Sequence, residues 1–403
     1  MTQQARAVVI GGGIGGLAAA AALHRTGWTV TVLERAPSLD PVGAAISLAP
    51  NGLRALDVLG IGDEIRDLAA WQGDGGLRTP GGRWLSRSSA TAAADRFGGP
   101  LVLLPRATLV DRLAALLPPG AVRTASPAAL ADAGDRTRPA RVRAGADELE
   151  AELVVGADGV NSRVRGALFP VHPGPAYAGF TTWRVLVPVP GAEFASHETW
   201  GPGRLWGTHP LKDGRVYAYA AATAPAGEHA PDDEKAELLR RYGDWHDPIP
   251  AVLAAVRPED VLRRDVHHLA QPLPAYHSGR TVLLGDAAHA MPPTLGQGGN
   301  QALEDAVVLA FPHARLRTGG GTAGGADLAA YTAARLPRTT AIARRAVRAG
   351  RLGMTGNRAV AAVRNTVITA LSTAGPALFL RGFDGIADWR PPYASGREHA
   401  GQR

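Results

Sequence analysis

The sequence has no cysteine, and only two of its 403 residues are lysines, Lys212 and Lys235. The lack of cysteine excludes disulfides, iron–sulfur clusters and thiolate chemistry, and it makes the cytoplasm the default expected location. Nearly all of the positive charge behind the net +7 is arginine, in a chain rich in alanine, glycine and proline. We therefore interpret the charge as a compositional bias and expect no nucleic-acid partner.

Long apolar runs are also missing. The most membrane-like stretch, Val367–Leu380, is short, contains Pro376 and lies between Arg364 and Arg381, whereas a spanning helix needs about 20 apolar residues. We interpret this stretch as a packed helix or one that covers an active site, and expect no stable membrane insertion. The polar residues 2–6 do not read as a secretory signal.

Two kinds of sequence pattern alternate along the chain. Arg6–Ile10, Ala18–Arg25 and Thr29–Leu33 read as strand, helix and strand, which predicts an α/β fold with a doubly wound sheet. From about 177 to 268, alternating residues between Pro/Gly turns predict antiparallel strands. With the apolar strand Thr281–Leu284, the pattern typical of the doubly wound sheet begins again. The chain thus reads as a nucleotide-binding domain interrupted by a β-rich domain.

We assign the segments accordingly. The nucleotide-binding domain takes residues 1–75, 98–175 and 267–350, the β-sheet substrate domain takes 76–97 and 176–266, and a helical C-terminal segment takes 351–403. One predicted helix carries an arginine-rich run, which we expect to be a solvated face: Arg335, Arg338, Arg344, Arg345, Arg348 and Arg351.

The first glycine-rich motif, VVIGGGIGGLAAA, places Gly11, Gly13 and Gly16 in the GxGxxG spacing between a strand and a helix. Gly11 permits the tight turn, Gly13 lets the backbone approach a pyrophosphate, and Gly16 lets helix and strand pack closely. Glu34 ends the next strand, where its carboxylate can accept hydrogen bonds from a ribose diol. With these parts in register the motif predicts a dinucleotide site, but it does not separate FAD from NAD.

Two further turns favour FAD. ELVVGADGVNSRVR places Asp158-Gly159 after a strand, and LLGDAAHAMPPTLGQGGN places Gly285-Asp286 after another. A carboxylate at a strand end, such as Asp286, can hold a polyol, and FAD has a ribityl chain where NAD has none. The loop Gly296–Asn300 opens a helix whose N-terminal N–H groups suit the anionic edge of a reduced flavin.

Together these motifs resemble those of class A FAD-dependent monooxygenases of the aromatic-hydroxylase type. The resemblance extends to PVGAAISLAPNGLRALDVLGIGD, PRATLVDRL, AGFTTWRV and the terminal ADWRPP, and it covers nearly the whole chain. Within this family, the sequence most resembles the subgroup that contains urate hydroxylase, 3-hydroxybenzoate 6-hydroxylase and zeaxanthin epoxidase. It implies a Rossmann-like FAD-binding domain of the p-hydroxybenzoate-hydroxylase type, interrupted by a β-rich substrate domain and followed by C-terminal helices.

The resemblance also implies the chemistry. NADH or NADPH would reduce FAD, and O₂ would give a C4a-hydroperoxyflavin that hydroxylates or epoxidises an aromatic, polyketide or terpenoid substrate in a site that excludes water. The site residues implied for the cofactor are Gly11, Gly13, Ile14, Gly15, Gly16, Glu34, Arg35, Ala45, Arg106, Asp158, Gly159, Asp286, Gly296, Gly298, Gly299 and Asn300.

Substrate contacts are expected from the β-rich domain. Arg184 could pair with a substrate carboxylate or phenolate, His209 could deprotonate a phenol with a pKa near working pH, and Tyr217 lies where urate-hydroxylase-like proteins have a substrate tyrosine. Further candidates are Trp183, Trp206 and Tyr219, with Pro293 shaping the loop beside the flavin. Where those enzymes bear an arginine this chain has Leu205, and Arg204 one step away would face the other side of a strand. We interpret His289 mainly as local structure.

Other interpretations remain open. The same scaffold could serve Baeyer–Villiger insertion, oxidative decarboxylation, a flavoprotein reductase, a non-redox isomerase or a flavin-binding regulator without enzymatic activity. No metal site is expected, and a monomer and a homodimer are equally compatible with the sequence.

Overall fold

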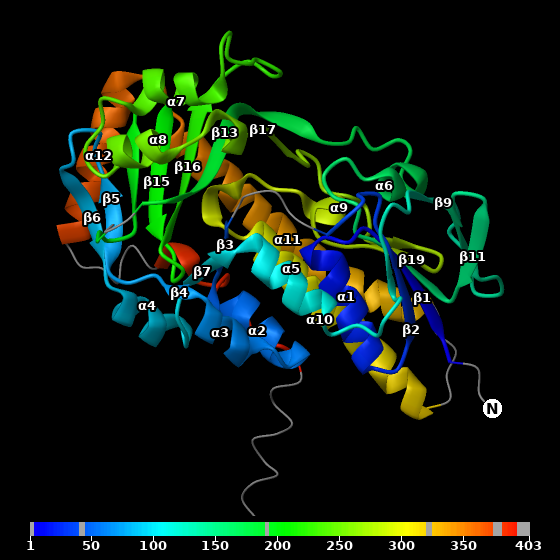
Figure 1. Ribbon diagram of the computed structural model, residues 1–403. Coiled ribbons are helices and arrows are strands. Elements are labelled where there is room, and N and C mark those ends of the chain that lie inside the picture. The colour runs from blue at the N-terminus through cyan, green and yellow to red at the C-terminus, as the bar shows by residue number, and fades with distance from the viewer. Residues whose placement is uncertain (1–3, 40–44, 190–192, 320–324, 374–380, 393–403) are drawn as a thin grey trace, which may run out of the picture.

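The computed structural model describes residues 4–39, 45–189, 193–319, 325–373 and 381–392 (Figure 1). Two large sheets organise these residues. Blue, yellow and gold elements gather around the first sheet, and green strands form most of the second.

The first sheet has six strands in the order β18-β19-β12-β1-β2-β8, all parallel except β18 against β19. Its central strands are buried on both faces, as continuous apolar runs in parallel sheets require. The bounds are β1 Arg6–Ile10, β2 Thr29–Leu33, β8 Val122–Arg123, β12 Leu153–Gly156, β18 His277–Ser278 and β19 Thr281–Leu283.

Helices pack around this sheet. In α1 (Ile14–Arg25) a run of alanines at 18–22 is buried, and their small side chains let the helix lie close to β1 and to α10 (Gly298–Gly319). Around it lie α2 (Pro50–Leu59), α5 (Arg106–Ala114) and α11 (Gly325–Gly353). The carboxyl ends of β1, β12 and β19 therefore all open onto helix starts, which is where ligands bind in open α/β sheets.

The second sheet has seven strands in the order β17-β13-β16-β15-β14-β5-β6, antiparallel except for β14 against β5. The strands are β5 Gly75–Arg78, β6 Trp84–Ser88, β13 Ala176–Pro188, β14 His197–Gly201, β15 Arg204–Pro210, β16 Arg215–Thr223 and β17 Leu262–His268. One face packs on α7 (Glu234–Tyr242) and α8 (Ile249–Ala255) in a core of its own. The strands thus come from the two segments that we assign to the substrate domain.

Smaller elements complete the fold. Two three-stranded sheets have the orders β11-β10-β9 and β3-β7-β4. Their strands are β3 Ala45–Leu48, β4 Ala70–Trp71, β7 Val102–Pro105, β9 Ala128–Asp132, β10 Ala140–Ala144 and β11 Asp147–Ala151. The remaining helices are α3 Gly62–Leu68, α4 Ala90–Phe97, α6 Arg163–Leu168, α9 Asp286–His289 and α12 Arg358–Thr373.

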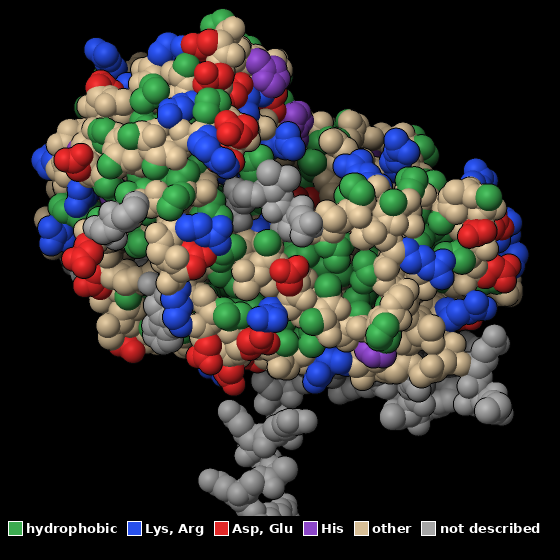
Figure 2. Space-filling view, in the orientation of Figure 1, with side chains coloured by type: hydrophobic (Ala, Val, Ile, Leu, Met, Phe, Trp, Pro, Cys, Tyr) green, Lys and Arg blue, Asp and Glu red, His purple; other side chains and the backbone are tan. Residues whose placement is uncertain are grey.

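The predicted α/β class and element types are confirmed, and most differences lie at element ends. The first helix begins at Ile14 rather than Ala18, because the glycine turn runs directly into it. The prediction of one solvated arginine face was wrong for Arg335, which is 1% exposed, and for Arg338, which is half-buried. Over the face in Figure 2, basic and acidic side chains are interspersed, as a compositional origin of the charge requires.

The stretch Val367–Leu380 is only partly described. Its first residues end α12, which packs on β6 and buries Ala361 and Arg364, and residues 374–380 lie outside the described part. Val367 is 50% exposed, so packing does not bury it, and the alternative of a helix that covers an active site stays a prediction. Among the described residues, no helix combines the length and hydropathy that a membrane crossing requires.

Candidate active site

The first glycine turn has the geometry of a phosphate-binding loop. Gly11 has φ +114°, and a Cβ there would lie 2.3 Å from the carbonyl oxygen of Ala157. A Cβ on Gly16 would lie 2.0 Å from the Gly11 oxygen, so both glycines are required by packing. A Cβ on Gly13 would meet no atom of the described residues within 4 Å. The open space above Gly13, at the N-terminus of α1, therefore fits an anionic group.

The acid at the end of β2 is held by the backbone. Oε2 of Glu34 accepts the Gly12 N–H at 2.6 Å and Oε1 accepts the Ala36 N–H at 2.9 Å. Each oxygen keeps a second lone pair, so the carboxylate remains able to accept a ribose hydroxyl. Arg35 beside it is exposed.

Two residues of this motif also have a packing role. A Cβ on Gly15 would lie 2.8 Å from Cδ1 of Leu284 and 3.1 Å from Cβ of Ala302. Gly15 therefore permits α1 to pack against Leu284, which follows β19, and against α10, and its cofactor role stays a prediction. Ile14 is likewise buried in the core.

The second motif is also used locally. Oδ1 of Asp158 accepts the Ser162 hydroxyl at 2.5 Å, and Oδ2 accepts the N–H groups of Arg163 at 2.7 Å and Val164 at 3.1 Å. The carboxylate thus caps α6. Asp158 and Gly159 remain beside the Gly11 turn, where only their backbone is free to meet a cofactor.

The third motif presents a free acid. Asp286 is the one exposed residue between Thr281 and Met291, and among the described residues its carboxylate has no hydrogen-bond partner. A Cβ on Gly298 would lie 3.8 Å from its Oδ1, which places the carboxylate beside the first turn of α10. The segment around Asp286 is buried, but its carboxylate is exposed and unpaired. This arrangement fits the prediction that Asp286 accepts hydrogen bonds from the ribityl chain of FAD.

The guanidinium group of Arg106 lies close to this acid, and that of Arg184 lies close to Arg106. Arg106, at the start of α5, has a buried Nε without a partner in the described part of the chain. Burial lowers the pKa of Arg106, the charge of Asp286 raises it, and the charge of Arg184 lowers it. No described carboxylate pairs with Arg184. The two cations are thus free to meet anionic or polar groups of a cofactor or substrate.

The loop from Gly296 enters α10 earlier than the sequence predicts. The helix begins at Gly298 instead of Gln301, so the N–H groups of Gly298, Gly299 and Asn300 form its first turn. Gly296 has φ +61°. The Asn300 side chain is fully buried: its amide nitrogen donates to Ser47 O and Gly296 O, and its oxygen accepts the Ala49 N–H at 3.0 Å. The backbone of Asn300 thus remains available to a cofactor, as the prediction of backbone N–H contacts from this loop requires.

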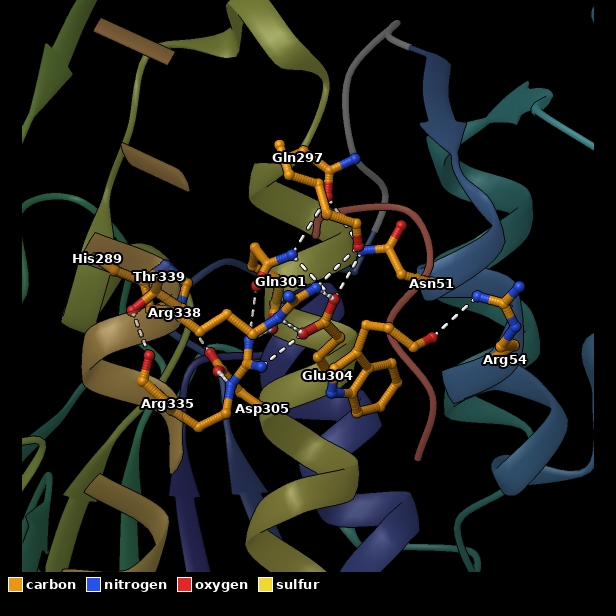
Figure 3. A network of polar contacts seen from close by, with 12 residues as sticks. Asn51, Arg54, His289, Gln297, Gln301, Glu304, Asp305, Arg335, Arg338 and Thr339 are labelled. Atoms are coloured by element: carbon orange, nitrogen blue, oxygen red, sulfur yellow. Dashed lines mark hydrogen bonds and ion pairs between the residues drawn. The ribbon is translucent and has the colours of Figure 1, made fainter. Parts of the chain in front are cut away.

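Sequence reasoning missed a buried polar network behind this loop (Figure 3). Arg335 donates from Nε to Asp305 at 2.6 Å and from Nη1 to Glu304 at 2.5 Å, and all three side chains are at most 1% exposed. Glu304 also accepts from Asn51, whose side chain reaches Gln297. The network therefore joins α2, α10 and α11 directly beneath the candidate flavin loop. The signal in the sequence was the adjacent acids of LEDA, which reads as an ordinary helix segment.

The predicted substrate residues share one face of the seven-stranded sheet. Arg184 is the cross-strand partner of Tyr219, and His209 is the partner of Tyr217. Trp183 and Trp206 lie on the opposite face, in the core beneath α7 and α8. Naming these two tryptophans as substrate contacts was therefore wrong.

His209 differs from the general base that the sequence predicted. Burial lowers its pKa to about 3, with a smaller contribution from His197. Its Nδ1 lies 3.2 Å from Oε1 of Gln72, an acceptor, so Nδ1 carries the proton and Nε2 is left as a neutral acceptor. A pKa near working pH is thus contradicted, although a hydrogen bond from a substrate hydroxyl remains compatible.

Tyr217 and Tyr219 have different surroundings. The Tyr219 hydroxyl donates to Glu198, whereas the Tyr217 hydroxyl has no partner among the described residues. Burial raises the pKa of Tyr217, with an opposing effect from Arg184, so the phenol stays protonated and can donate a hydrogen bond. Ala45 packs in the same cluster as Tyr217, and Pro293 is exposed at the start of a 3-10 turn.

The strand parity argued for Leu205 is confirmed. Leu205 packs with Phe180 and Met354 on the candidate substrate face. Arg204 lies on the other side, with its guanidinium carbon 5.3 Å from the ring centroid of Trp245. This part of the substrate face is therefore apolar.

Taken together, the described residues fit FAD. The chain offers an anion space at Gly13, a ribose acceptor at Glu34, a free acid at Asp286, a free cation at Arg106 and a helix start at Gly298. No group of three or more potential metal ligands is present among the described residues.

Comparisons with known proteins agree with this geometry. The family described as FAD binding domain matches residues 4–346. The chain is similar to the aurachin C monooxygenase/isomerase of Stigmatella aurantiaca, with 35% identity over 91% of this chain and 94% of that protein. It is also 35% identical to the 3-amino-4-hydroxybenzoate 2-monooxygenase of Streptomyces cremeus, over 85% and 86% of the two chains.

A solved structure matches over the same extent. HpxO of Klebsiella pneumoniae, complexed with FAD and uric acid, superposes with a TM-score of 0.84 at 25% identity, over 95% of this chain and 97% of that one.

Proposed function

The chain belongs to the FAD-binding-domain family and is an FAD-dependent monooxygenase, and we propose that it hydroxylates an electron-rich aromatic small molecule held on the face that carries Arg184 and Tyr217. Bound FAD supplies the redox chemistry, accepting hydride and activating O₂. We further propose NADH or NADPH as the electron donor.

One observation carries the proposal: an unpaired Arg184 lies on the same face as a Tyr217 hydroxyl that has no partner in the described residues. A half-buried cation without a partner, beside a hydroxyl that is free to donate, is stabilised when an anionic or polar group of a ligand contacts both. A phenolate or carboxylate of the substrate would do so. Arg106, which the charge of Arg184 affects, ties the same face to the flavin side.

The relatives support the substrate class. Their names include hydroxybenzoate, hydroxynicotinate and urate, each an oxygenated aromatic ring. Urate itself is disfavoured by Leu205, which puts an apolar side chain where the urate-hydroxylase-like enzymes are implied to carry an arginine. We therefore propose a phenolic substrate with one apolar edge against Leu205 and Phe180.

The residue roles follow from the site. Arg184 binds the anionic edge of the substrate, Tyr217 donates a hydrogen bond, and neutral His209 accepts one at Nε2. Asp286 and Arg106 hold the cofactor, together with Glu34 and the Gly13 turn. Binding and orientation by these side chains, rather than proton transfer by a charged histidine, is the protein's share of the reaction.

The test is a measurement of coupled turnover. NADH and NADPH oxidation and oxygen uptake are followed with a panel of phenols, hydroxybenzoates and urate, and products are identified by mass spectrometry. We expect a phenol to stimulate both rates and to gain one oxygen. A ring-expanded product would instead indicate Baeyer–Villiger insertion. Flavin reduction without oxygen-dependent product would indicate a reductase and overturn the proposal.

A matched pair of variants checks the substrate site. Arg184→Met should raise the KM for the stimulating phenol about tenfold or more, because a charge-assisted hydrogen bond contributes about 1.5–3 kcal/mol. Arg264, on the neighbouring strand β17, is the control, since its side chain bonds only to the Arg263 carbonyl among the described residues. Arg264→Met should leave KM unchanged.

A further inference from the structure

The short helix that carries Asp286 is held from below by one carboxylate. Oδ2 of Asp305 accepts the Gly285 N–H at 2.9 Å and Nε2–H of His289 at 2.6 Å. Gly285 directly precedes Asp286, and His289 ends α9. A single oxygen thus fixes both ends of the turn, and His289 and Asp305 are 4% and 0% exposed.

The position of that carboxylate is itself fixed. Nε of Arg335 donates to Oδ1 of Asp305 at 2.6 Å, and Arg335 is anchored by Glu304 and Gln301 on α10 (Figure 3). Burial alone would raise the pKa of Asp305, but the charges of His289 and Arg335 lower it to about 2. Asp305 therefore stays ionised as a fixed acceptor at neutral pH.

The turn needs such support because its backbone conformation is demanding. Gly285 has φ 58° and ψ −142°, which glycine adopts readily and other residues do not. Its carbonyl oxygen also accepts the N–H groups of Ala288 and His289, both at 2.9 Å. The orientation of the Gly285 peptide consequently decides where the Asp286 carboxylate points.

Asp305 also belongs to α10, whose first turn lies beside Asp286. This helix begins at Gly298, two turns before Asp305. The same side chain therefore sets the spacing between the two cofactor elements of the third motif, the acid at α9 and the N–H groups at the start of α10.

We propose that Asp305 is a positioning residue for the cofactor, which acts by holding Gly285 and His289 so that Asp286 is aimed at FAD. The inference rests on the proposed role of Asp286. It differs from a plain core ion pair, because an ion pair would affect the stability of the apoprotein but would not act through Asp286.

The test compares two neighbouring acids of equal burial. Glu304 is also 0% exposed and pairs with Arg335, but its hydrogen bonds go to Asn51, Gln301 and Arg338 and none goes to α9. Apoprotein of Asp305→Asn and of the control Glu304→Gln is titrated with FAD by fluorescence quenching, and the Tm of each apoprotein is measured. We expect the Kd for FAD to rise about ten- to hundredfold in Asp305→Asn. The rise should be clearly smaller in Glu304→Gln, because Asp305 keeps its contacts with Gly285 and His289 and Arg335 keeps its contacts with Asp305 and Gln301.

A double-mutant cycle with Asp286→Asn makes the role specific. If Asp305 acts through Asp286, then Asp286→Asn/Asp305→Asn should bind FAD no more weakly than Asp286→Asn alone. Fully additive losses, or a lowered Tm with unchanged Kd in Asp305→Asn, would overturn the positioning role. A normal Kd in Asp286→Asn would instead refute the proposed role of Asp286.

A second variant covers the case in which Asp305→Asn does not fold. His289→Gln removes the imidazole that donates a hydrogen bond to Asp305 and leaves the hydrogen bond from the Gly285 N–H to Asp305 in place. We expect a smaller rise in the Kd for FAD, about three- to tenfold, again absent in the Asp286→Asn background. An unchanged Kd for FAD in a folded His289→Gln variant would refute the role of the His289–Asp305 hydrogen bond at that end of α9.

Discussion

Replacing Gly13 with alanine should abolish FAD binding without unfolding the apoprotein. Gly13 has φ −76° and ψ 178°, a conformation that alanine adopts freely, and an added Cβ would meet no atom within 4 Å in the described part of the chain. The loss of an N-cap glycine costs a few tenths of a kcal/mol and the stiffer unfolded chain returns about as much. The free energy of unfolding should thus change by less than about 1 kcal/mol.

The cofactor should be affected far more strongly. The added methyl group would occupy the space that we assign to the pyrophosphate, and would push it away from the N–H groups at the start of α1. Losing two charge-assisted hydrogen bonds of about 1.5–3 kcal/mol each corresponds to at least a hundredfold rise in the Kd for FAD. Gly11→Ala is the contrasting variant. There φ is +114° and the Cβ would lie 2.3 Å from the Ala157 oxygen, so the fold itself should lose about 3 kcal/mol or more.

Two measurements separate these effects: urea unfolding of each apoprotein, and titration with FAD followed by flavin fluorescence. Gly13→Ala should unfold like wild type and fail to quench flavin, whereas Gly11→Ala should unfold at lower urea. If Gly13→Ala bound FAD as tightly as wild type, the pyrophosphate would not lie at this turn and the assignment of the whole site would fail.

Four further outcomes are expected. Tyr217→Phe should raise substrate KM about fivefold to tenfold with an unchanged Kd for FAD, because a neutral hydrogen bond contributes about 1 kcal/mol; equal KM values in a steady-state assay would refute the contact. Because the pKa of His209 is about 3, the pH–rate profile of His209→Asn should have the same shape as that of wild type between pH 5 and 8. If the wild-type profile showed an ionisation near pH 6.5 that the variant lacked, this pKa would be wrong. The lowered pKa of Asp305 contributes roughly 2–3 kcal/mol to the free energy of unfolding above about pH 4, and this contribution is lost as the pH falls toward 2. Between pH 6 and pH 3, the free energy of unfolding measured in urea should therefore fall more in wild type than in Asp305→Asn. Leu205→Ala should change KM and the ratio of product to oxygen consumed, whereas Arg204→Ala, on the opposite face, should alter only stability, by about 1 kcal/mol or less.

Much of the fold follows from local sequence. The central strands Arg6–Ile10 and Thr29–Leu33 have the predicted bounds, because apolar runs between glycine turns suit only buried parallel strands here. The structural reasons for Gly11 and Gly16 could be predicted, since a positive φ at Gly11 and close backbone approach at both positions leave room only for glycine. Strand parity also placed Leu205 and Arg204 on opposite faces.

The same rule could have prevented one error. Trp183 and Arg184 are adjacent on one strand, so they cannot both face a substrate, and the structure places only Arg184 on the candidate face. The buried network could not be predicted in this way. Arg335 lies 30 and 31 positions from its partners Asp305 and Glu304, and a helix arginine reads as solvated unless tertiary packing is known. The pKa of His209 likewise depends on burial that no local pattern reports.

The pairing of Ala49 with Asn300 has a consequence for how the protein is made. The two residues are 251 positions apart, so at about 5–20 residues per second the ribosome spends roughly 10–50 s between them. During that interval the nascent chain displays the dinucleotide turn and α2 without the helix that closes them. The full set of groups that we assign to FAD is therefore assembled only after the chain has been synthesised beyond Asn300.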